Sequence, residues 1–128
     1  ADAEAHYRLG QALRMLTRRG VLILASGGLT HNLHDLVVDA DEGAVLPYVA
    51  EFRDWFVAAL QRRDLPALFD WHRQAPHAAR AHPSPEHLLP LYVALGAAGD
   101  QAELRSAFSD CQLGSLVLDA FVFGRDAD

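Results

Sequence analysis

The sequence predicts an α/β fold, and three stretches carry that prediction. Residues Ala3–Arg19 repeat apolar side chains at helical spacing, and Gly20 follows them as a helix-ending glycine would. The short apolar run Val21–Ala25 comes next, and its length and branched side chains predict a strand buried on both faces of a central sheet. A last strand is expected over Ser115–Phe123. Because helix, glycine and buried strand form half of a βαβ unit, α/β is the natural class.

The elements between these stretches are expected to be mainly helical. In the first helix, the expected buried face consists of Leu9, Ala12, Leu13 and Leu16. Pro47–Arg63 predicts a second helix, and Asp64 is expected to cap a third one, with Pro66 in its first turn. Residues 75–80 read as a loop, and residues 100–110 as a polar connection that can hold a short helix. Asp119, in the middle of the last strand, suggests that one face of that strand opens to solvent or to a site.

Length and composition limit the kinds of protein that this chain can be. Its 128 residues, 51% of them hydrophobic, suit one globular domain over residues 1–128. The net charge is −6 and the eleven basic residues are scattered arginines, which argues against a nucleic-acid partner. No apolar run reaches the ~18–20 residues that a membrane span needs. The single cysteine, Cys111, excludes an internal disulfide framework and is typical of the reducing cytoplasm.

Two histidine-bearing segments are the candidates for chemistry. Ser26–Leu33 (Ser-Gly-Gly-Leu-Thr-His-Asn-Leu) directly follows the predicted strand Val21–Ala25, where ligands gather in open α/β sheets, and it contains His31. It has neither a phosphate-loop nor a dinucleotide-binding pattern. Ala81–Leu91 packs two histidines, three prolines and a glutamate into a rigid corner before an apolar helical stretch, and it contains His87.

The start of the helix after this corner has two interpretations. Ser84 can cap a helix whose first position is Pro85, which would place Glu86 and His87 in its first turn. Alternatively the helix begins only at Pro90, since a proline beyond the first turn clashes with the carbonyl four residues earlier.

A catalytic metal site usually needs three imidazole or carboxylate ligands that converge in space. His31 and His87 are placed for such a role, but each could equally satisfy a local backbone group. His82 precedes Pro83 and can simply end a loop. Adjacent helical positions point about 100° apart, so Glu86 and His87 are not expected to bind one ion together.

Several motifs occur together in an order that is typical of one family. They are Ser26-Gly-Gly-Leu-Thr-His31-Asn-Leu, Ala75-Pro76, Ala81-His82-Pro83-Ser84-Pro85-Glu86-His87, Ala94-Leu-Gly-Ala-Ala-Gly99 and Gly114-Ser115. With them the chain resembles the DOPA-dioxygenase-type (LigB-like) class III extradiol ring-cleavage dioxygenases. The resemblance implies helices packed on a short mixed β-sheet, as the C-terminal portion of the LigB-like fold.

The resemblance covers only the C-terminal half of the family, whose members are about twice as long. It implies that two metal-binding histidines belong to an N-terminal half. The chain starts without Met, at a helix that looks internal to that fold. We therefore expect a fragment, a processed product or one piece of a two-part assembly.

By resemblance, His87 would be a metal ligand and His31 the acid/base, close enough to the ion to bind it in some states. His82 is the candidate for substrate contact. The implied cofactor is one non-haem Fe(II) or Zn(II) ion per site, since a face with a carboxylate suits iron and a histidine-only face also suits zinc. The implied reaction inserts O2 into a catechol-like, DOPA-like ring. Imidazoles, with an ordinary pKa near ~6.5, can both accept and return a proton at neutral pH.

Two other functions stay open, as do the partners. The chain could be a non-catalytic metal- or protein-binding domain of the same fold, or a zinc hydrolase. A catechol-like substrate and O2 are the expected small-molecule partners. A strand at Val21–Ala25 without sheet neighbours would expose an apolar edge, so a second polypeptide half or self-association is also expected.

Overall fold

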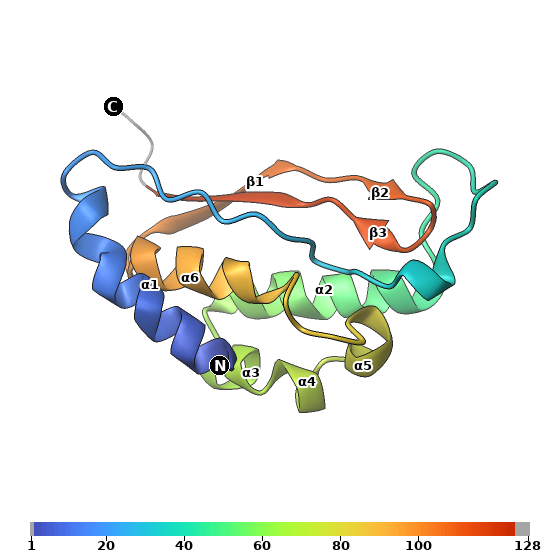
Figure 1. The fold of residues 1–128 in the computed structure, drawn as a ribbon, viewed down its shortest axis with the longest axis horizontal. Helices are drawn as coiled ribbons and strands as arrows, with labels where there is room; N and C mark the ends of the chain where they lie inside the picture. The colour runs from blue at the N-terminus through green and yellow to red at the C-terminus, as the bar shows by residue number, and fades with distance from the viewer. Residues whose placement is uncertain (1, 125–128) are drawn as a thin grey trace.

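A computed structural model describes residues 2–124 and places a layer of helices beneath a long β-hairpin (Figure 1). The helices are α1 (Ala3–Thr17), η1 (Leu33–Asp35, a 3₁₀ turn), α2 (Pro47–Arg62), α3 (Leu65–Phe69), α4 (Trp71–Gln74), α5 (Ala78–Ala81) and α6 (Leu89–Ala98). The strands are β1 (Glu103–Phe108), β2 (Cys111–Gln112), β3 (Leu116–Val117) and β4 (Ala120–Gly124). No helix in this part of the chain is long and apolar enough to cross a membrane.

The strands form two short antiparallel pairs. β1 pairs with β4 from Glu103 opposite Gly124 to Phe108 opposite Ala120, and β2 pairs with β3. Parallel pairing among the described residues is limited to one isolated bridge between Val45 and Gly114. Helices and strands thus share one layered fold, which confirms the α/β class. The prediction of a short helix within residues 100–110 is wrong. Glu103–Phe108 forms β1 instead, because pairing with β4 supplies the backbone hydrogen-bond partners that a helix would have provided internally.

The prediction of a doubly buried strand at Val21–Ala25 is wrong for the described part of the chain. The segment is extended, but it has no strand pairing. Leu22 is 84% exposed and Leu24 is 86% exposed. An extended segment becomes a β-strand only when a neighbouring strand is hydrogen-bonded to it. None of the described residues forms such a neighbour for Val21–Ala25.

The first helix packs through a different face from the one predicted. Its buried residues are Ala3, Tyr7 and Gly10, whereas the stripe containing Leu9 is largely exposed. Gly10 decides this face, because a Cβ there would lie 2.1 Å from the carbonyl oxygen of Val93 on α6. Gly96 of α6 makes a similar close approach from the other helix, since a Cβ added there would lie 2.0 Å from the Tyr7 carbonyl oxygen. Two glycines therefore allow the α1 and α6 backbones to touch, and this contact outweighs the leucine pattern.

The core lies between α2, α6 and the short helices. Its largest fully buried side chains include Phe52 and Phe56 of α2 and Tyr92 of α6, whose hydroxyl donates to the Leu68 carbonyl at 2.6 Å. The predicted α2 is confirmed, and the Asp64 carboxylate caps α3 by accepting from the Ala67 N–H at 3.2 Å. The expected loop at residues 75–80 instead contributes to α5.

α6 begins at Leu89 with Pro90 at its second position, which favours the later of the two predicted starts. Ser84 does not cap this helix; its hydroxyl donates to the Glu86 carboxylate at 2.8 Å. The long strand expected over Ser115–Phe123 is divided into β3 and β4. Between them the Asp119 side chain is shielded from solvent and accepts from Arg53 Nε at 2.7 Å, so an opening to solvent is wrong at this residue. Asp119 does border a cavity that His87 also lines, which agrees with the other alternative, a face open to a site.

Candidate functional site

Two imidazoles from distant parts of the sequence meet in the fold. His31 lies on the loop that follows the extended segment, and His87 lies on the turn that leads into α6. Their ring centroids are 3.6 Å apart and their planes are inclined by 19°, so the rings are stacked. Both side chains are partly exposed. The structure thus brings together the two histidines that the sequence singled out.

A glycine pair holds the two segments against each other. The Gly28 N–H donates to the His87 carbonyl oxygen at 2.8 Å. At Gly27 a Cβ would lie 2.1 Å from the same oxygen, which leaves no room for any side chain. The His31 N–H donates to the Ala81 carbonyl at 2.9 Å. These contacts fix both ends of the His31 loop to the corner that carries His87.

Buried polar side chains tie the loop to β3, to the turn before β3 and to α5. Thr30 Oγ1 donates to the Ser115 carbonyl at 2.7 Å and accepts from the Val117 N–H at 2.9 Å. Asn32 Nδ2 donates to the Arg80 carbonyl at 2.7 Å. Thr30 and Asn32 therefore anchor the residues on both sides of His31. Sequence reasoning missed this role. The available signal was that two hydrogen-bonding residues, Thr30 and Asn32, flank His31 shortly after two glycines.

Replacing Thr30 by valine is expected to lower the free energy of unfolding by about 1–3 kcal/mol. Valine keeps the shape but leaves a buried carbonyl and a buried N–H without their partner. Urea unfolding of the purified chain measures the change. Thr17→Val is the matched control, because the Thr17 hydroxyl bonds to the Arg14 carbonyl at an exposed site, and it should change stability by less than about 0.5 kcal/mol. Equal effects of both substitutions would contradict the anchoring role.

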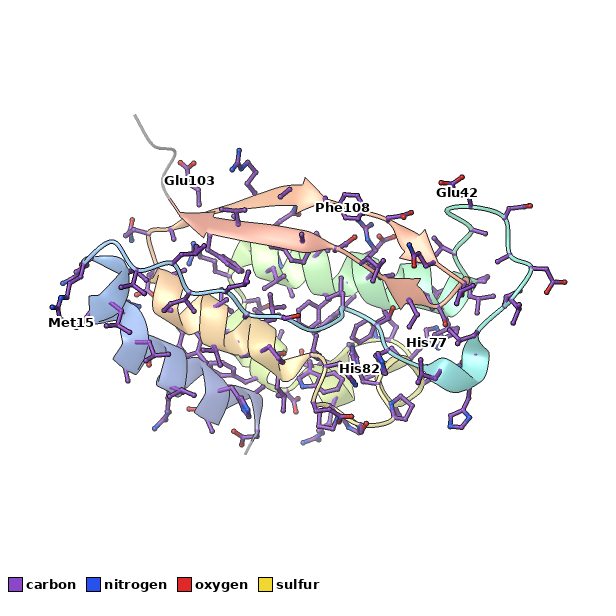
Figure 2. All side chains as sticks on the ribbon, turned by 45° about the horizontal axis from the view of Figure 1, so that its top comes forward. Met15, Glu42, His77, His82, Glu103 and Phe108 are labelled. Atoms are coloured by element: carbon purple, nitrogen blue, oxygen red, sulfur yellow. The ribbon has the colours of Figure 1, made fainter. Side chains whose placement is uncertain are left out.

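His82 lies beneath the same loop. Its side chain is labelled in Figure 2, on the connection between α5 and α6, and the residue is 2% exposed. Its ring packs edge-on against Phe52 and Trp71, and its Nε2–H donates to the Leu29 carbonyl at 2.7 Å. Burial lowers the pKa of His82 to about 4, so the ring is neutral at pH 7. The substrate contact predicted for His82 stays a prediction, and this burial favours support of the loop instead.

Glu86 lies beside the histidine pair at the surface. The hydrogen bond from Ser84 lowers the pKa of this exposed carboxyl, which is therefore charged at neutral pH. One of its oxygens lies 3.6 Å from His87 Nε2. That separation is longer than a hydrogen bond, so Glu86 leaves the His87 nitrogen free to take another partner.

The donor set for a metal ion is incomplete within residues 2–124. No group of three or more His, Cys, Asp or Glu side chains in this range could hold an ion. An imidazole binds a metal through a nitrogen lone pair in the plane of its ring. Because the two stacked ring planes are nearly parallel, His31 and His87 cannot both direct a lone pair at one nearby ion in this arrangement. The site offers one imidazole ligand and a second imidazole beside it.

Comparison with known proteins identifies the family. Residues 1–121 match the family described as the catalytic LigB subunit of aromatic ring-opening dioxygenase. The chain therefore belongs to the LigB family of ring-opening dioxygenases.

Relatives with this fold are longer than the chain. A protein named 4,5-DOPA dioxygenase extradiol from Beta vulgaris is 40% identical over 102 residues, which are 80% of this chain and 37% of that protein. Its namesake from Portulaca grandiflora is 35% identical over 95% of this chain and 45% of its own length. The crystal structure of an uncharacterized Escherichia coli K12 protein matches with a TM-score of 0.80 at 26% identity, over 94% of this chain and 50% of the other. The chain thus spans about half the length of its relatives or less, which fits the C-terminal half expected from the sequence.

Proposed function

We propose that this chain supplies the His31–His87 side of the active site of an extradiol dioxygenase, which opens a catechol-like, DOPA-like ring with O2. The observation that supports the proposal is the stacked pair of imidazoles, 3.6 Å apart, in a chain of the LigB family. The relatives named as 4,5-DOPA dioxygenases favour an aromatic diol as the substrate class.

In this proposal His87 holds a non-haem Fe(II) or Zn(II) ion. Its imidazole is partly exposed and forms no hydrogen bond with residues 2–124, and the Glu86 carboxylate lies 3.6 Å from its Nε2, so this nitrogen is available. Both ions accept imidazole ligands. When bound, such an ion would bring the diol and O2 together. The further ligands would come from outside the described residues.

His31 is proposed as the acid/base. The His31 ring lies against the His87 ring, and the His31 N–H is hydrogen-bonded to the Ala81 carbonyl. The His31 side chain is therefore held beside the proposed metal ion on His87. A group held in this way can take a proton from a substrate hydroxyl and return it later in the reaction. Because the stacked rings cannot both bind one ion as placed, the geometry favours one ligand and one proton carrier over two ligands.

Substitution of the two histidines tests the roles separately. In the longer polypeptide of which we propose this chain is a part, His87→Ala is expected to lose both metal and ring opening. His31→Ala is expected to keep the metal and to lose turnover by a factor of about 10²–10⁴, as loss of a general acid/base does. Metal analysis and oxygen consumption with a catechol measure the two properties. Normal metal content and activity in His87→Ala would overturn the proposal.

The isolated chain of 128 residues provides a second test. We expect it to bind metal weakly and to show no ring opening, because one imidazole ligand is too few for a tight site. If the longer polypeptide bound iron or zinc stoichiometrically but showed no turnover, a non-catalytic metal-binding domain would be favoured instead. Ester cleavage without O2 consumption would favour a zinc hydrolase.

A further inference from the structure

We propose that the extended segment Val21–Ser26 is a docking strand for the other half of the family's polypeptide, which pairs with its backbone and covers its exposed leucines. This inference rests on the two-part organisation in the proposed function and names the surface that joins the parts. It concerns assembly, and its tests do not depend on turnover.

The backbone of this segment is unpaired among the described residues. The Val21 N–H donates to the Leu16 carbonyl, and the next bonded backbone group is the Gly28 N–H. Between them, no N–H or carbonyl of residues 22–27 takes part in a hydrogen bond with the described part of the chain. An extended row of free donors and acceptors is the template that an added strand uses.

The side chains of the segment alternate as those of a strand do. Leu22 and Leu24 point outward and are 84% and 86% exposed, while Ile23 and Ala25 are half-buried. Leu22 and Leu24, on the same side of an extended backbone, leave a large apolar area in contact with water, which burial against a partner would relieve. The segment therefore has the pattern of a strand that is covered on both faces.

An apolar cavity of about 670 Å³ borders the segment, and residues 21–26 all contribute to its wall. Its other walls are α6, with Leu91 and Ala94, and the β4 residues Ala120–Phe123. β4 pairs with β1 along one edge, and its other edge has no partner among residues 2–124. Figure 1 shows the segment running from the end of α1 along the hairpin, between it and α6. Beside the extended segment there are therefore an unpaired edge of β4 and an apolar surface on α6, and a docked strand could contact both.

The exposed surface continues onto α1. Its leucine stripe, which the sequence predicted to be buried, is largely exposed, as is Met15, which Figure 2 labels at the outer end of this helix. The hydrogen bond from Val21 to Leu16 joins this stripe directly to the extended segment. A partner that covers the leucines of the segment would therefore reach the helix as well.

Two observations favour the other half of the polypeptide, rather than a second copy of this chain, as the partner of the docking strand. They are the lengths of the relatives and the position of His87. The solved relative keeps this half's fold while containing about as much chain again, and that chain must pack against some face. His87 lines the same cavity, so an occupant would border the proposed metal ligand. The other half could bring the further ligands there, whereas a second copy would only repeat the same two histidines.

Hydrogen exchange tests this docking strand. The isolated chain is compared with the polypeptide translated from the complete reading frame that encodes it. The backbone amides of Leu22–Ser26 should exchange at least 100-fold more slowly in the longer polypeptide. Equal exchange in the two, or a reading frame that encodes no further half, would overturn the proposal. Protection in the isolated chain that disappears on dilution would also overturn it, because it would identify a second copy as the occupant.

A matched pair of substitutions locates the contact. Both substitutions are made in the longer polypeptide, and the exchange of the Leu22–Ser26 amides is measured again. Leu24→Lys should speed their exchange at least tenfold, whereas Val38→Lys, at an 83% exposed position on another loop, should not. Equal effects of the two substitutions would overturn the docking strand. His87→Ala should leave the protection of these amides intact even if it abolishes activity, so failure of the assembly and failure of the chemistry are distinguishable.

Discussion

Replacing Gly27 by alanine is expected to separate the two histidines and to lower the free energy of unfolding by about 1–3 kcal/mol. The new Cβ would lie 2.1 Å from the His87 carbonyl oxygen and 3.1 Å from its carbon. Both are backbone atoms that no rotamer change can move. Either the loop or the corner must shift, which would stretch the Gly28–His87 hydrogen bond and open the stacked pair. Urea unfolding measures the loss of stability, and histidine NMR shifts report the separation of the rings.

Gly28→Ala is the matched control for this prediction. It lies next in the sequence and keeps the N–H that donates to His87. The nearest contact of a Cβ at Gly28 is the Thr30 carbonyl oxygen at 3.2 Å, which a shift of a few tenths of an ångström relieves. We expect a clearly smaller loss of stability and an intact histidine pair. If both alanines had the same effect, the close approach at Gly27 would not be what brings the histidines together.

Lowering the pH from about 6.5 to about 4 is expected to remove about 3 kcal/mol of stability through His82 alone. The folded-state pKa of His82 is about 4, below its ordinary value of 6.5, because burial disfavours the charged ring. As the pH falls through this window, the unfolded chain binds the proton first, so unfolding becomes easier. This contribution is complete above pH 6.5 and lost by about pH 4. Urea unfolding at closely spaced pH values measures the slope.

Substitution of His82 by glutamine isolates this effect. The glutamine amide can donate to the Leu29 carbonyl as His82 Nε2 does, but it does not titrate. Stability of this variant should therefore depend much less on pH between 6.5 and 4. His72→Gln serves as the control, since His72 is exposed. An unchanged pH slope in His82→Gln would show that other groups cause the acid sensitivity.

The burial of His82 also gives it a role in placing His31. Its ring fills the space beside Phe52 and Trp71 and bonds to Leu29, two residues before His31. Its other nitrogen, Nδ1, is buried without a partner among residues 2–124, so a proton there would gain no acceptor from them. The neutral ring is therefore the form that supports the loop.

The sequence by itself determined the features that depend on local chemistry. The periodicity of Pro47–Arg63 predicted α2, and Asp64 with Pro66 predicted the start of α3, because helix patterns and caps act over a few residues. The motifs around His31 and His87 indicated the family and the two candidate residues before any distance was known. The chain's partial coverage of its relatives also agrees with the half expected from those motifs.

The tertiary structure decided every feature that depends on a distant partner. Val21–Ala25 has the composition of a buried strand, yet without a neighbour it stays exposed, because a strand is stabilised by another strand. The buried face of α1 follows the close approach of the α1 and α6 backbones at Gly10 and at Gly96, and no pattern within α1 could reveal a glycine on α6. Asp119 is buried because Arg53 reaches it from α2. The histidine pair itself forms because Gly27 lets two backbones meet, which is a contact between residues far apart in the chain.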